Sequence, residues 1–287
     1  YSTTAGKGMV SLQWHWHAPS DAEPGNNNFY TEHTDFDIRQ AVIPGTEEYQ
    51  LVVRDIDDIA VQLQRFEDAG VPVLWRPLHE AGGGWFWWGA HGPEPCLKLY
   101  DLIFTRLMQV HQLHNLIWVW STPEADWYPG NHKVDIIGYD SYPGSYNYGA
   151  QKYWFDRLHE LTGGEKLIAM TENGPVPDPD ECFTMEAPWL YFMSWSDLVE
   201  SQNEATHLQA VYSHPQVVTL ESDNALWRST LYPDTWYPGY KDAKGRFFHD
   251  FSYAGYRQGA VPLPDRSDNV VDITQAPYNA DPTGSLD

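Results

Sequence analysis

Two glutamates stand directly after apolar, strand-like runs of the chain. Glu80 closes residues 73–80, and Glu172 follows residues 167–171. Short apolar runs with β-branched residues are typical of buried strands, and the carboxyl ends of parallel strands meet at one edge of a sheet, where loops build active sites. Hydrolysis of a glycosidic bond needs an acid that protonates the leaving oxygen and a carboxylate that attacks the anomeric carbon or activates water. The pair therefore indicates chemistry on glycosidic bonds.

The segment after Glu80 has the composition of a carbohydrate site. Residues 82–84 are three glycines, and residues 85–88 read Trp-Phe-Trp-Trp. Glycines let the backbone pass close to a ligand, and flat aromatic faces suit the C–H faces of sugar rings. The chain holds 14 Trp and 18 Tyr. Many of these rings are expected to fill the core, but the number also favours a ligand groove.

Composition and charge exclude several classes of partner. With 287 residues, 42% of them hydrophobic and 20% charged, the chain has the composition of a globular domain that can bury a large core. A formal net charge of -23 opposes binding to nucleic acid, anionic membranes and acidic polysaccharides, whereas a neutral polysaccharide remains compatible. No apolar run is long enough for a membrane span. The chain opens on Tyr1 without a signal-peptide pattern, as a mature protein or a fragment would.

Other chemistries find no support in the motifs. The two cysteines, Cys96 and Cys182, fit no metal-binding spacing, and we expect free thiols. The chain has no nucleotide-binding glycine motif, no Gly-x-Ser-x-Gly elbow and no His-Glu-x-x-His among its 12 histidines. Residues 175–181 are acidic but interrupted by prolines, which favours a loop over a calcium site. We therefore expect no metal and no cofactor.

The motif around Glu80 resembles that of a known family. Residues 76–80, Arg-Pro-Leu-His-Glu, and residues 84–89, Gly-Trp-Phe-Trp-Trp-Gly, are similar to segments of glycoside hydrolase family 26, best known for β-mannanases. The resemblance covers roughly residues 8–222. It implies that Glu80 is the general acid/base and that Glu172, which follows Thr171, is the nucleophile. The family is retaining, which implies a covalent glycosyl-enzyme intermediate and carboxyl groups about 5–5.5 Å apart.

The same resemblance implies roles for residues near the two glutamates. Tyr142 corresponds to a tyrosine that hydrogen-bonds the nucleophile, and Trp195 to a platform under the reacting sugar. The expected substrate-binding residues are His15, His79, Trp85, Trp88, Asp140, Tyr142 and Trp195. His17 is a second candidate for the role of His15, and Asp140 could serve a sugar hydroxyl or the structure. Arg76 could orient a carboxylate or form a buried ion pair, and we expect Trp127 and Tyr128 on the rim.

Strand-like and helix-like segments alternate along the first 222 residues. The expected strands cover residues 9–17, 71–77, 116–120, 134–140, 167–171 and 189–195, and the expected helices cover 55–69, 94–113, 151–161 and 205–212. Residues 18–45 read as a rim loop. Alternation of this kind predicts a parallel sheet in a (β/α)8 TIM barrel. Six strands are too few for closure, and two βα units of the resembled family are missing before the first one. We therefore expect a barrel that is incomplete at its N-terminus.

Residues 223–287 break this rhythm. They are rich in proline and predict no amphipathic helix. We interpret residues 1–222 as a glycoside hydrolase β/α-barrel and 223–287 as an irregular extension. Residues 248–256, with 270–273, resemble the opening of a pectate-lyase-like β-helix domain, which suggests the start of a second carbohydrate-active domain.

These features predict an endo-acting, retaining β-1,4-mannanase that hydrolyses mannan, galactomannan or glucomannan. Two alternatives remain open: another retaining β-glycanase, such as a β-1,3-xylanase or a mixed-linkage glucanase, and a non-catalytic glycan-binding fragment. We expect a monomer that is secreted or held at the cell surface, because its substrate is a polymer outside the cell.

Overall fold

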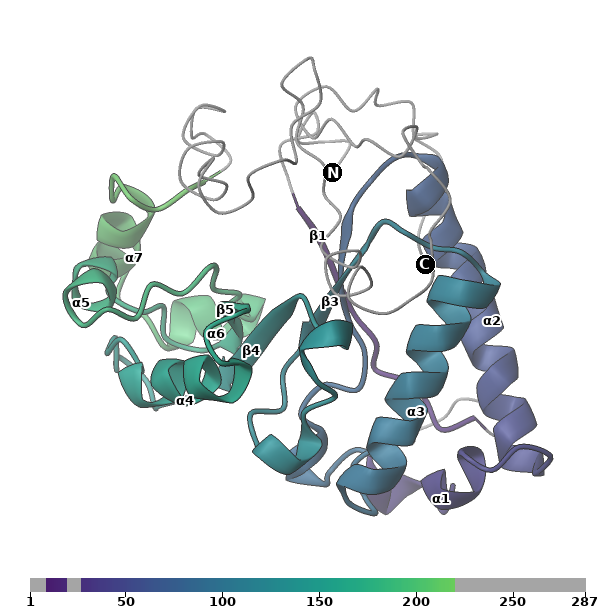
Figure 1. The fold of residues 1–287 in the computed structure, drawn as a ribbon. Coiled ribbons are helices and arrows are strands. Elements are labelled where there is room, and N and C mark those ends of the chain that lie inside the picture. Colours follow the sequence, from purple (N-terminus) through teal and green to yellow (C-terminus); the bar gives the residue numbers. More distant parts are fainter. Residues whose placement is uncertain (1–8, 20–26, 220–287) are drawn as a thin grey trace.

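Five parallel strands form one curved sheet in the computed structural model, which describes residues 9–19 and 27–219 of the chain. The strands are β1 (Val10–Gln13), β2 (Val73–Arg76), β3 (Leu116–Trp120), β4 (Ile136–Ser141) and β5 (Leu167–Asn173). Each pairs with the next one along the chain, in the order β1-β2-β3-β4-β5. The sheet curls into a half-barrel with helices outside it, which confirms the predicted fold class (Figure 1).

The helices lie outside the curled sheet. They are α1 (Ile38–Ala41), α2 (Glu47–Asp68), α3 (Pro93–Thr105), α4 (Lys152–Thr162), α5 (Pro179–Thr184), α6 (Ser196–Ser201) and α7 (Ala205–Tyr212). A π-helical turn, Arg106–Val110, extends α3. In Figure 1, α2 and α3 lie side by side on the part of the sheet nearest β1, and α4 to α7 surround β4 and β5. None of the described helices has the length and apolar character needed to cross a bilayer.

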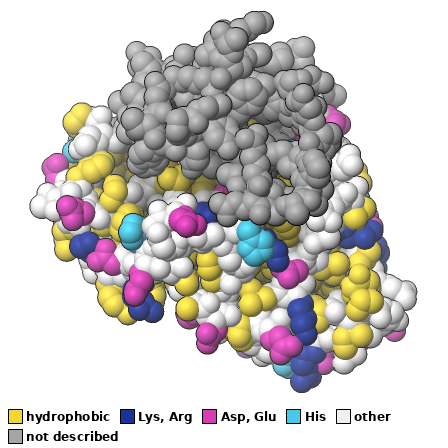
Figure 2. Space-filling view, in the orientation of Figure 1, with side chains coloured by type: hydrophobic (Ala, Val, Ile, Leu, Met, Phe, Trp, Pro, Cys, Tyr) yellow, Lys and Arg dark blue, Asp and Glu magenta, His cyan; other side chains and the backbone are white. Residues whose placement is uncertain are grey.

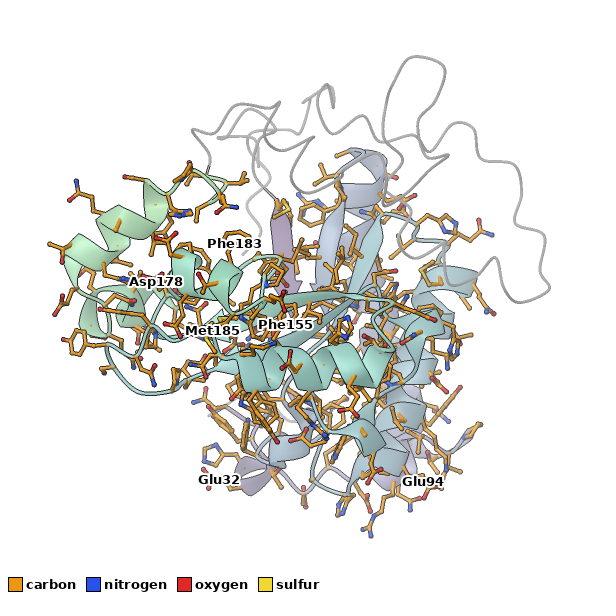
Figure 3. The ribbon with its side chains drawn as sticks, turned by 60° about the vertical axis from the view of Figure 1, so that its left-hand side comes forward. Glu32, Glu94, Phe155, Asp178, Phe183 and Met185 are labelled. Carbon is orange, nitrogen blue, oxygen red and sulfur yellow. The ribbon has the colours of Figure 1, made fainter. Side chains whose placement is uncertain are left out.

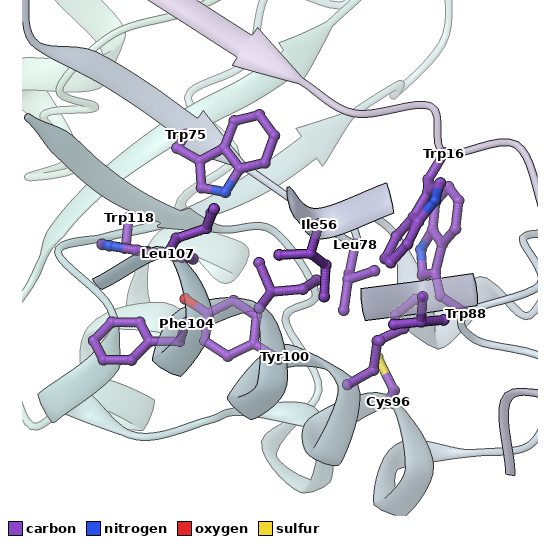
Figure 4. Packing of buried hydrophobic residues seen from close by; sticks show 14 of the residues in the cluster. Trp16, Ile56, Trp75, Leu78, Trp88, Cys96, Tyr100, Phe104, Leu107 and Trp118 are labelled. Carbon is purple, nitrogen blue, oxygen red and sulfur yellow. The ribbon is translucent and has the colours of Figure 1, made fainter. Parts of the chain in front are cut away.

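The main core lies between strands β1 to β3 and helices α2 and α3. Trp75 of β2 and Trp118 of β3 are register partners, and both are fully buried against these helices. Figure 4 shows Tyr100, Phe104 and Leu107 packed below them. Each such aromatic side chain removes about 150–250 Å² from water, so these rings contribute strongly to stability. Part of the aromatic content is therefore core, as expected.

The opposite face of the strands forms the barrel interior. It buries small and branched side chains, and polar groups replace them at the carboxyl end, where Arg76, Asp140 and Thr171 meet. The buried apolar set is Leu74, Ile117, Val119, Ile136 and Ala169. The strands thus hold the polar residues of one sheet edge above an apolar floor.

Helix α2 is longer than the predicted 55–69. It begins at Glu47, because Thr46 caps it by accepting the Tyr49 amide and because Val52 is buried one turn before the predicted start. At the other end Gly70 takes a left-handed φ of 64° and closes the helix as predicted.

Two predictions for the C-terminal half were wrong in part. Residues 189–195 are not a strand of the sheet but an extended segment beside β5, bonded through the Leu190, Met170 and Asn173 amides. The acidic stretch 175–181 is not wholly a loop, because Asp178 caps the short helix α5 through the Glu181 amide. Proline at the first helical position is tolerated there, since its missing N–H would be unpaired in any case.

Residues 27–45 of the predicted rim loop contain the 3-10 turn Thr31–His33 and helix α1. Cys96 and Cys182 are free, as expected, and both are buried. The surface in Figure 2 carries acidic side chains spread among basic and neutral ones, without one dominant patch. The predictions made for residues 223–287 lie outside the described residues.

Candidate active site

Glu80 sits in a strained turn immediately after β2. Its φ is 52°, and Leu78 has a φ of 54°, so two non-glycine residues near the strand end adopt the left-handed region. Such conformations persist only where surrounding contacts fix them, and they concentrate at functional sites. Leu78 is buried in the main core, whereas Glu80 faces the pocket, where its Oε2 accepts a hydrogen bond from Trp85 Nε1 at 3.1 Å. The turn therefore buries the Leu78 side chain in the core and directs the Glu80 side chain into the pocket.

The glycines after Glu80 allow close packing within the loop. A Cβ at Gly83 would lie 2.1 Å from the Trp85 ring, and a Cβ at Gly89 would lie 2.0 Å from the Ala81 carbonyl oxygen. We expected these glycines to admit a ligand. At Gly83 the space that a side chain would occupy is taken by the Trp85 ring, which packs against the loop backbone.

Three donors converge on Glu172 at the end of β5. Arg76 Nη2 donates to its Oε1, while Tyr142 Oη and Trp195 Nε1 donate to its Oε2 at 2.6 and 2.7 Å. Tyr142 thus makes the hydrogen bond that the resemblance implied. With both oxygens bonded, the carboxylate is fixed in orientation and its charge is compensated.

Arg76 joins Glu172 to a second acid, Asp140 of β4. Arg76 Nη1 donates to both Asp140 oxygens at 2.8 and 2.9 Å, and Thr171 Oγ1 donates to Asp140 Oδ1 at 2.6 Å. The Asp140 side chain is only 5% exposed. Of the two roles left open for Asp140, the contacts of its oxygens with Arg76 and Thr171 favour the structural one. Both roles considered for Arg76, orienting a carboxylate and forming a buried ion pair, describe the same contact.

A local irregularity brings these groups together. The register between β4 and β5 shifts after Tyr139, so that Asp140 pairs with Glu172. Thr171 and Glu172, although consecutive, both bond to interior groups as a result. Gly138 makes room for this, since a Cβ there would lie 2.2 Å from Thr171 Cγ2.

The two glutamates have pKa values shifted in opposite directions. Burial raises the pKa of Glu80 to about 7, and the negative charges of Asp140 and Glu172 add to this. Burial also acts to raise the pKa of Glu172. There the Arg76 charge and the hydrogen bonds from Tyr142 and Trp195 outweigh burial and lower the pKa. Near neutral pH one carboxyl can therefore hold a proton while the other is ionised.

Two neutral histidines form one side of the site. Burial lowers the pKa of His79 far below its usual range and also lowers that of His15. Their ring centroids are 4.6 Å apart, and the Gln13 amide nitrogen lies 3.5 Å from His15 Nδ1 and 3.4 Å from His79 Nε2. His17, the other candidate, is exposed and bonded to Asn28, so His15 is the residue at the site.

A pocket of about 490 Å³ opens between these groups. It collects seven of the predicted residues from segments far apart in the sequence, together with two that the sequence did not single out. Its lining residues are His15, Tyr30, His79, Glu80, Trp85, Phe86, Tyr142, Glu172 and Trp195. The exposed fractions of Trp85, Tyr142 and Trp195 are 48%, 45% and 39%, so their rings are available to a ligand.

Some predicted positions were wrong. Trp88 has no exposed surface: it lies in the main core, where its Nε1 donates to the His79 carbonyl and its ring stacks on Phe86, so it cannot be a subsite wall (Figure 4). Trp127 and Tyr128 are half-buried against the same core rather than on the pocket rim.

The pocket residues that sequence reasoning missed are Tyr30 and Phe86. Tyr30 forms an antiparallel bridge with Phe86 and stacks on its ring, with 5.5 Å between centroids. The only sequence signal for Phe86 was its place within the aromatic run. Tyr30 lies in a segment without periodicity, so nothing in the sequence distinguished it.

One carboxylate oxygen each from Glu80, Asp140 and Glu172 lie within 4.8 Å of one another. Three acids this close could bind a metal ion. Here Arg76 already places its guanidinium against two of them. The donor set therefore suits a pair of catalytic carboxyls supported by an internal cation.

Residues 2–222 match the family model described as glycosyl hydrolase family 26. Among curated proteins, the chain is 46% identical over 224 residues to a mannan endo-1,4-beta-mannosidase of Thermothelomyces thermophilus, covering 75% of this chain and 46% of that protein. It is 35% identical over 219 residues to mannan endo-1,4-beta-mannosidase B of Piromyces sp, covering 75% of this chain and 37% of that protein. The chain thus spans less than half the length of these relatives.

Solved structures give the same picture. A GH26-CBM35 beta-(1,4)-mannanase of Podospora anserina superposes with a TM-score of 0.73 at 44% identity, covering 77% of this chain and 52% of that one. A beta-mannanase from a symbiotic protist of the termite Reticulitermes speratus, complexed with gluco-manno-oligosaccharide, gives 0.70 at 38% identity, covering 75% of this chain and 68% of that one.

Proposed function

The chain belongs to glycosyl hydrolase family 26, and from that premise we propose that it is an endo-acting, retaining β-1,4-mannanase. Its substrates would be mannan, galactomannan and glucomannan. The observation that carries the proposal is the pair formed by Glu80 and Glu172 in one aromatic pocket, with pKa values displaced in opposite directions.

In the first step, ionised Glu172 attacks the anomeric carbon of the sugar while protonated Glu80 gives its proton to the leaving oxygen. The lowered pKa of Glu172 keeps the nucleophile ionised, and the raised pKa of Glu80 keeps the acid protonated near neutral pH. Tyr142 and Trp195 hold the attacking carboxylate from the side of its Oε2.

In the second step, Glu80 removes a proton from water, which then attacks the glycosyl-enzyme ester and releases Glu172. Once Glu172 is esterified it carries no charge. One of the negative charges that raise the pKa of Glu80 is then gone, so Glu80 ionises more readily. The same residue can thus act as acid and then as base.

The separation of the carboxyls supports retention. Retaining enzymes hold them about 5–5.5 Å apart, whereas inverting enzymes leave about 6.5–9.5 Å for a water molecule. Oxygens of Glu80 and Glu172 lie within 4.8 Å of each other, which is closer to the spacing of retaining enzymes than to that of inverting ones.

The substrate class rests on three supports. The exposed rings of Trp85, Tyr142 and Trp195 suit sugar faces, and the net charge of -23 favours a neutral polymer. The relatives are named for activity on mannan, and one was solved with a gluco-manno-oligosaccharide.

We further propose that residues 1–222 form the catalytic unit and that the protein acts as a monomer outside the cell. Gel filtration, and assays of a cell-free culture fluid, test these last two points.

The test is release of reducing sugar from β-1,4-mannan by wild type, Glu80→Gln and Glu172→Gln. Each substitution removes one ionisable group from a pair that acts as a unit, so each variant should lose nearly all activity. Glu94→Gln is the matched control, because Glu94 is exposed at the start of α3, away from the pocket (Figure 3). It should behave as wild type.

Proton NMR of the first product should show the β-anomer, as retention requires. A panel with β-1,3-xylan and mixed-linkage glucan separates mannanase from other β-glycanases. A folded wild type that is inert on every polymer but retains glycan binding would reject the enzyme proposal in favour of a binding role.

A further inference from the structure

The segment after β3, residues 121–124, adds no side chain to the pocket wall, yet it contacts the supports of both glutamates. Ser121 Oγ accepts a hydrogen bond from Arg76 Nη1 at 2.9 Å. Thr122 Oγ1 accepts one from the Ala81 amide, also at 2.9 Å. Ser121 and Thr122 are 2% and 1% exposed, so neither bond is shared with solvent.

The Thr122 bond lies where the Glu80 turn most needs support. Glu80 and Leu78 both have positive φ, and non-glycine residues keep this strained conformation only where the surrounding contacts hold it. The Ala81 amide belongs to the peptide bond that directly follows Glu80. Its acceptor therefore limits rotation of that peptide and so the direction of the Glu80 side chain.

The turn and the 121–124 segment are in direct contact. A Cβ at Gly82 would lie 2.6 Å from Glu124 Oε2 and 3.2 Å from Thr122 Cγ2. Thr122 is itself fixed, because its carbonyl accepts a hydrogen bond from the indole of buried Trp120 at 2.9 Å. The hydroxyl is thus held by the core on one side and holds the Glu80 turn on the other.

We propose that Thr122 is a positioning residue for the general acid Glu80, and that Ser121 is one for the nucleophile Glu172, acting through Arg76. The assignment rests on the proposed function, since it takes the roles of the two glutamates from it. Neither residue touches substrate. The end of β3 would then fix both halves of the reaction from one short segment.

The two roles predict different responses to the leaving group. A sugar leaving group needs a proton from Glu80, whereas dinitrophenolate departs without one. Both reactions need attack by Glu172. The value of kcat/KM reports formation of the glycosyl-enzyme, so it isolates this step for each substrate.

The experiment compares Thr122→Val, Thr122→Ser and Ser121→Ala in the intact protein, with a manno-oligosaccharide and a dinitrophenyl β-mannoside as substrates. Thr122→Val keeps the shape but removes the acceptor. Its kcat/KM for the oligosaccharide should fall by about 10- to 100-fold, the scale expected when a reacting group is misplaced. Its value for the dinitrophenyl substrate should be unchanged. Thr122→Ser keeps the hydroxyl and should match wild type on both substrates, whereas Ser121→Ala should lower kcat/KM for both.

Equal losses on the two substrates in Thr122→Val, or no loss on either, would overturn the role assigned to Thr122. Should Thr122→Val fail to fold, Thr122→Ala removes the same acceptor with a smaller side chain. Titration of the Glu80 carboxyl by carbon-13 NMR gives a readout that needs no turnover. It should move in Thr122→Val and stay in place in Thr122→Ser. If wild type proves inert on both substrates the mannanase proposal fails, while an unmoved titration separately rejects the positioning role.

Discussion

Glu80 and Glu172 are the same type of side chain in different surroundings. Both are withdrawn from water, but only Glu172 accepts hydrogen bonds from a guanidinium, a phenol and an indole. Glu80 accepts a single hydrogen bond, from Trp85 Nε1 at 3.1 Å, and lies near two other carboxylates. Desolvation therefore dominates at Glu80, whereas compensation dominates at Glu172. This difference supports the proposed roles of acid for Glu80 and nucleophile for Glu172 without reference to any relative.

The pH dependence of kcat/KM should follow from this difference between Glu80 and Glu172. Glu80 must be protonated for the first step, so activity should fall as pH rises through about 7. Glu172 must be ionised, so the acid limb should lie below 4.5, the ordinary glutamate value. In Glu80→Gln the residual activity should lose its alkaline limb. An alkaline limb that persists unchanged in this variant would assign the titration to another group.

Among the residues of the site, Arg76 is the one whose substitution should lower the free energy of unfolding most. Arg76→Met leaves Asp140 and Glu172 buried without their cation, and breaking a buried ion pair in this way costs about 3–5 kcal/mol. The Glu172 pKa is lowered in the folded state, so its contribution is present above the ordinary glutamate pKa and is lost as pH falls through the lowered value. The difference between variant and wild type should therefore shrink in acid.

Urea unfolding at neutral and acid pH measures this difference. Arg39→Met is the matched control, because Arg39 pairs with Asp37 on the surface and its side chain is 60% exposed. It should change stability little at either pH. A pH-independent loss in Arg76→Met would indicate that packing, rather than charge, is what Arg76 supplies.

At the level of single residues, the sequence predicted the two carboxylates better than it predicted the residues around them. Glu80 and Glu172 could be placed because they follow strand-like runs whose ends share one sheet edge, whereas Tyr142 was placed through the resemblance to a family tyrosine. Trp85 and Trp88 could not be told apart, since adjacent rings in an aromatic run carry no signal of which one turns inward. The Trp88 indole N–H donates a hydrogen bond to the His79 carbonyl, a contact that depends on the left-handed turn at Glu80, which lies between the two residues.

Among the elements, the loop from Glu80 to Gly89 controls how the Trp85 ring is presented. The ring lies against Gly83, where a Cβ would come within 2.1 Å, and its indole reaches Glu80. Gly83→Ala should displace the ring, raise KM for mannan and weaken the bond to Glu80. In a Trp85→Ala background the same substitution should have no further effect, since the clashing group is gone.

A double-mutant cycle on KM and kcat/KM checks this coupling. Additive losses in the double variant would show that Gly83 matters for the loop backbone and not for the ring. The φ of Gly83 is not in the positive region, so the alanine itself adds no backbone strain.

Elements marked by a clear apolar run or period were predictable, and those held by caps or by single contacts were not. Strand β3 has the predicted bounds because an unbroken apolar run defines it, and helix α7 also has the bounds predicted. The start of α2 depends on the Thr46 cap, and α5 on the Asp178 cap, both outside the apolar pattern. Residues 189–195 carry strand composition. Their pairing with β5 is nevertheless reduced to scattered bonds, with α6 beginning directly at Ser196.

For the whole molecule, the net charge of -23 gives the last prediction. A neutral galactomannan feels no long-range field, so its kcat/KM should vary little with salt. The same polymer bearing carboxymethyl groups is repelled at distances up to the Debye length, about 8 Å at physiological ionic strength. Its KM should be higher in dilute buffer and should fall as salt is added.

The two polymers differ in charge and in the bulk of the substituent, and only the effect of charge depends on salt, so the salt dependence separates electrostatic exclusion from subsite fit. A carboxymethyl substituent that simply does not fit the pocket would raise KM equally at every salt concentration. A KM that falls with salt would show that the carboxymethylated polymer is repelled as it approaches the negatively charged protein, before it reaches the pocket. The aromatic rings would then choose among neutral glycans, and the charge of the molecule would exclude the acidic ones.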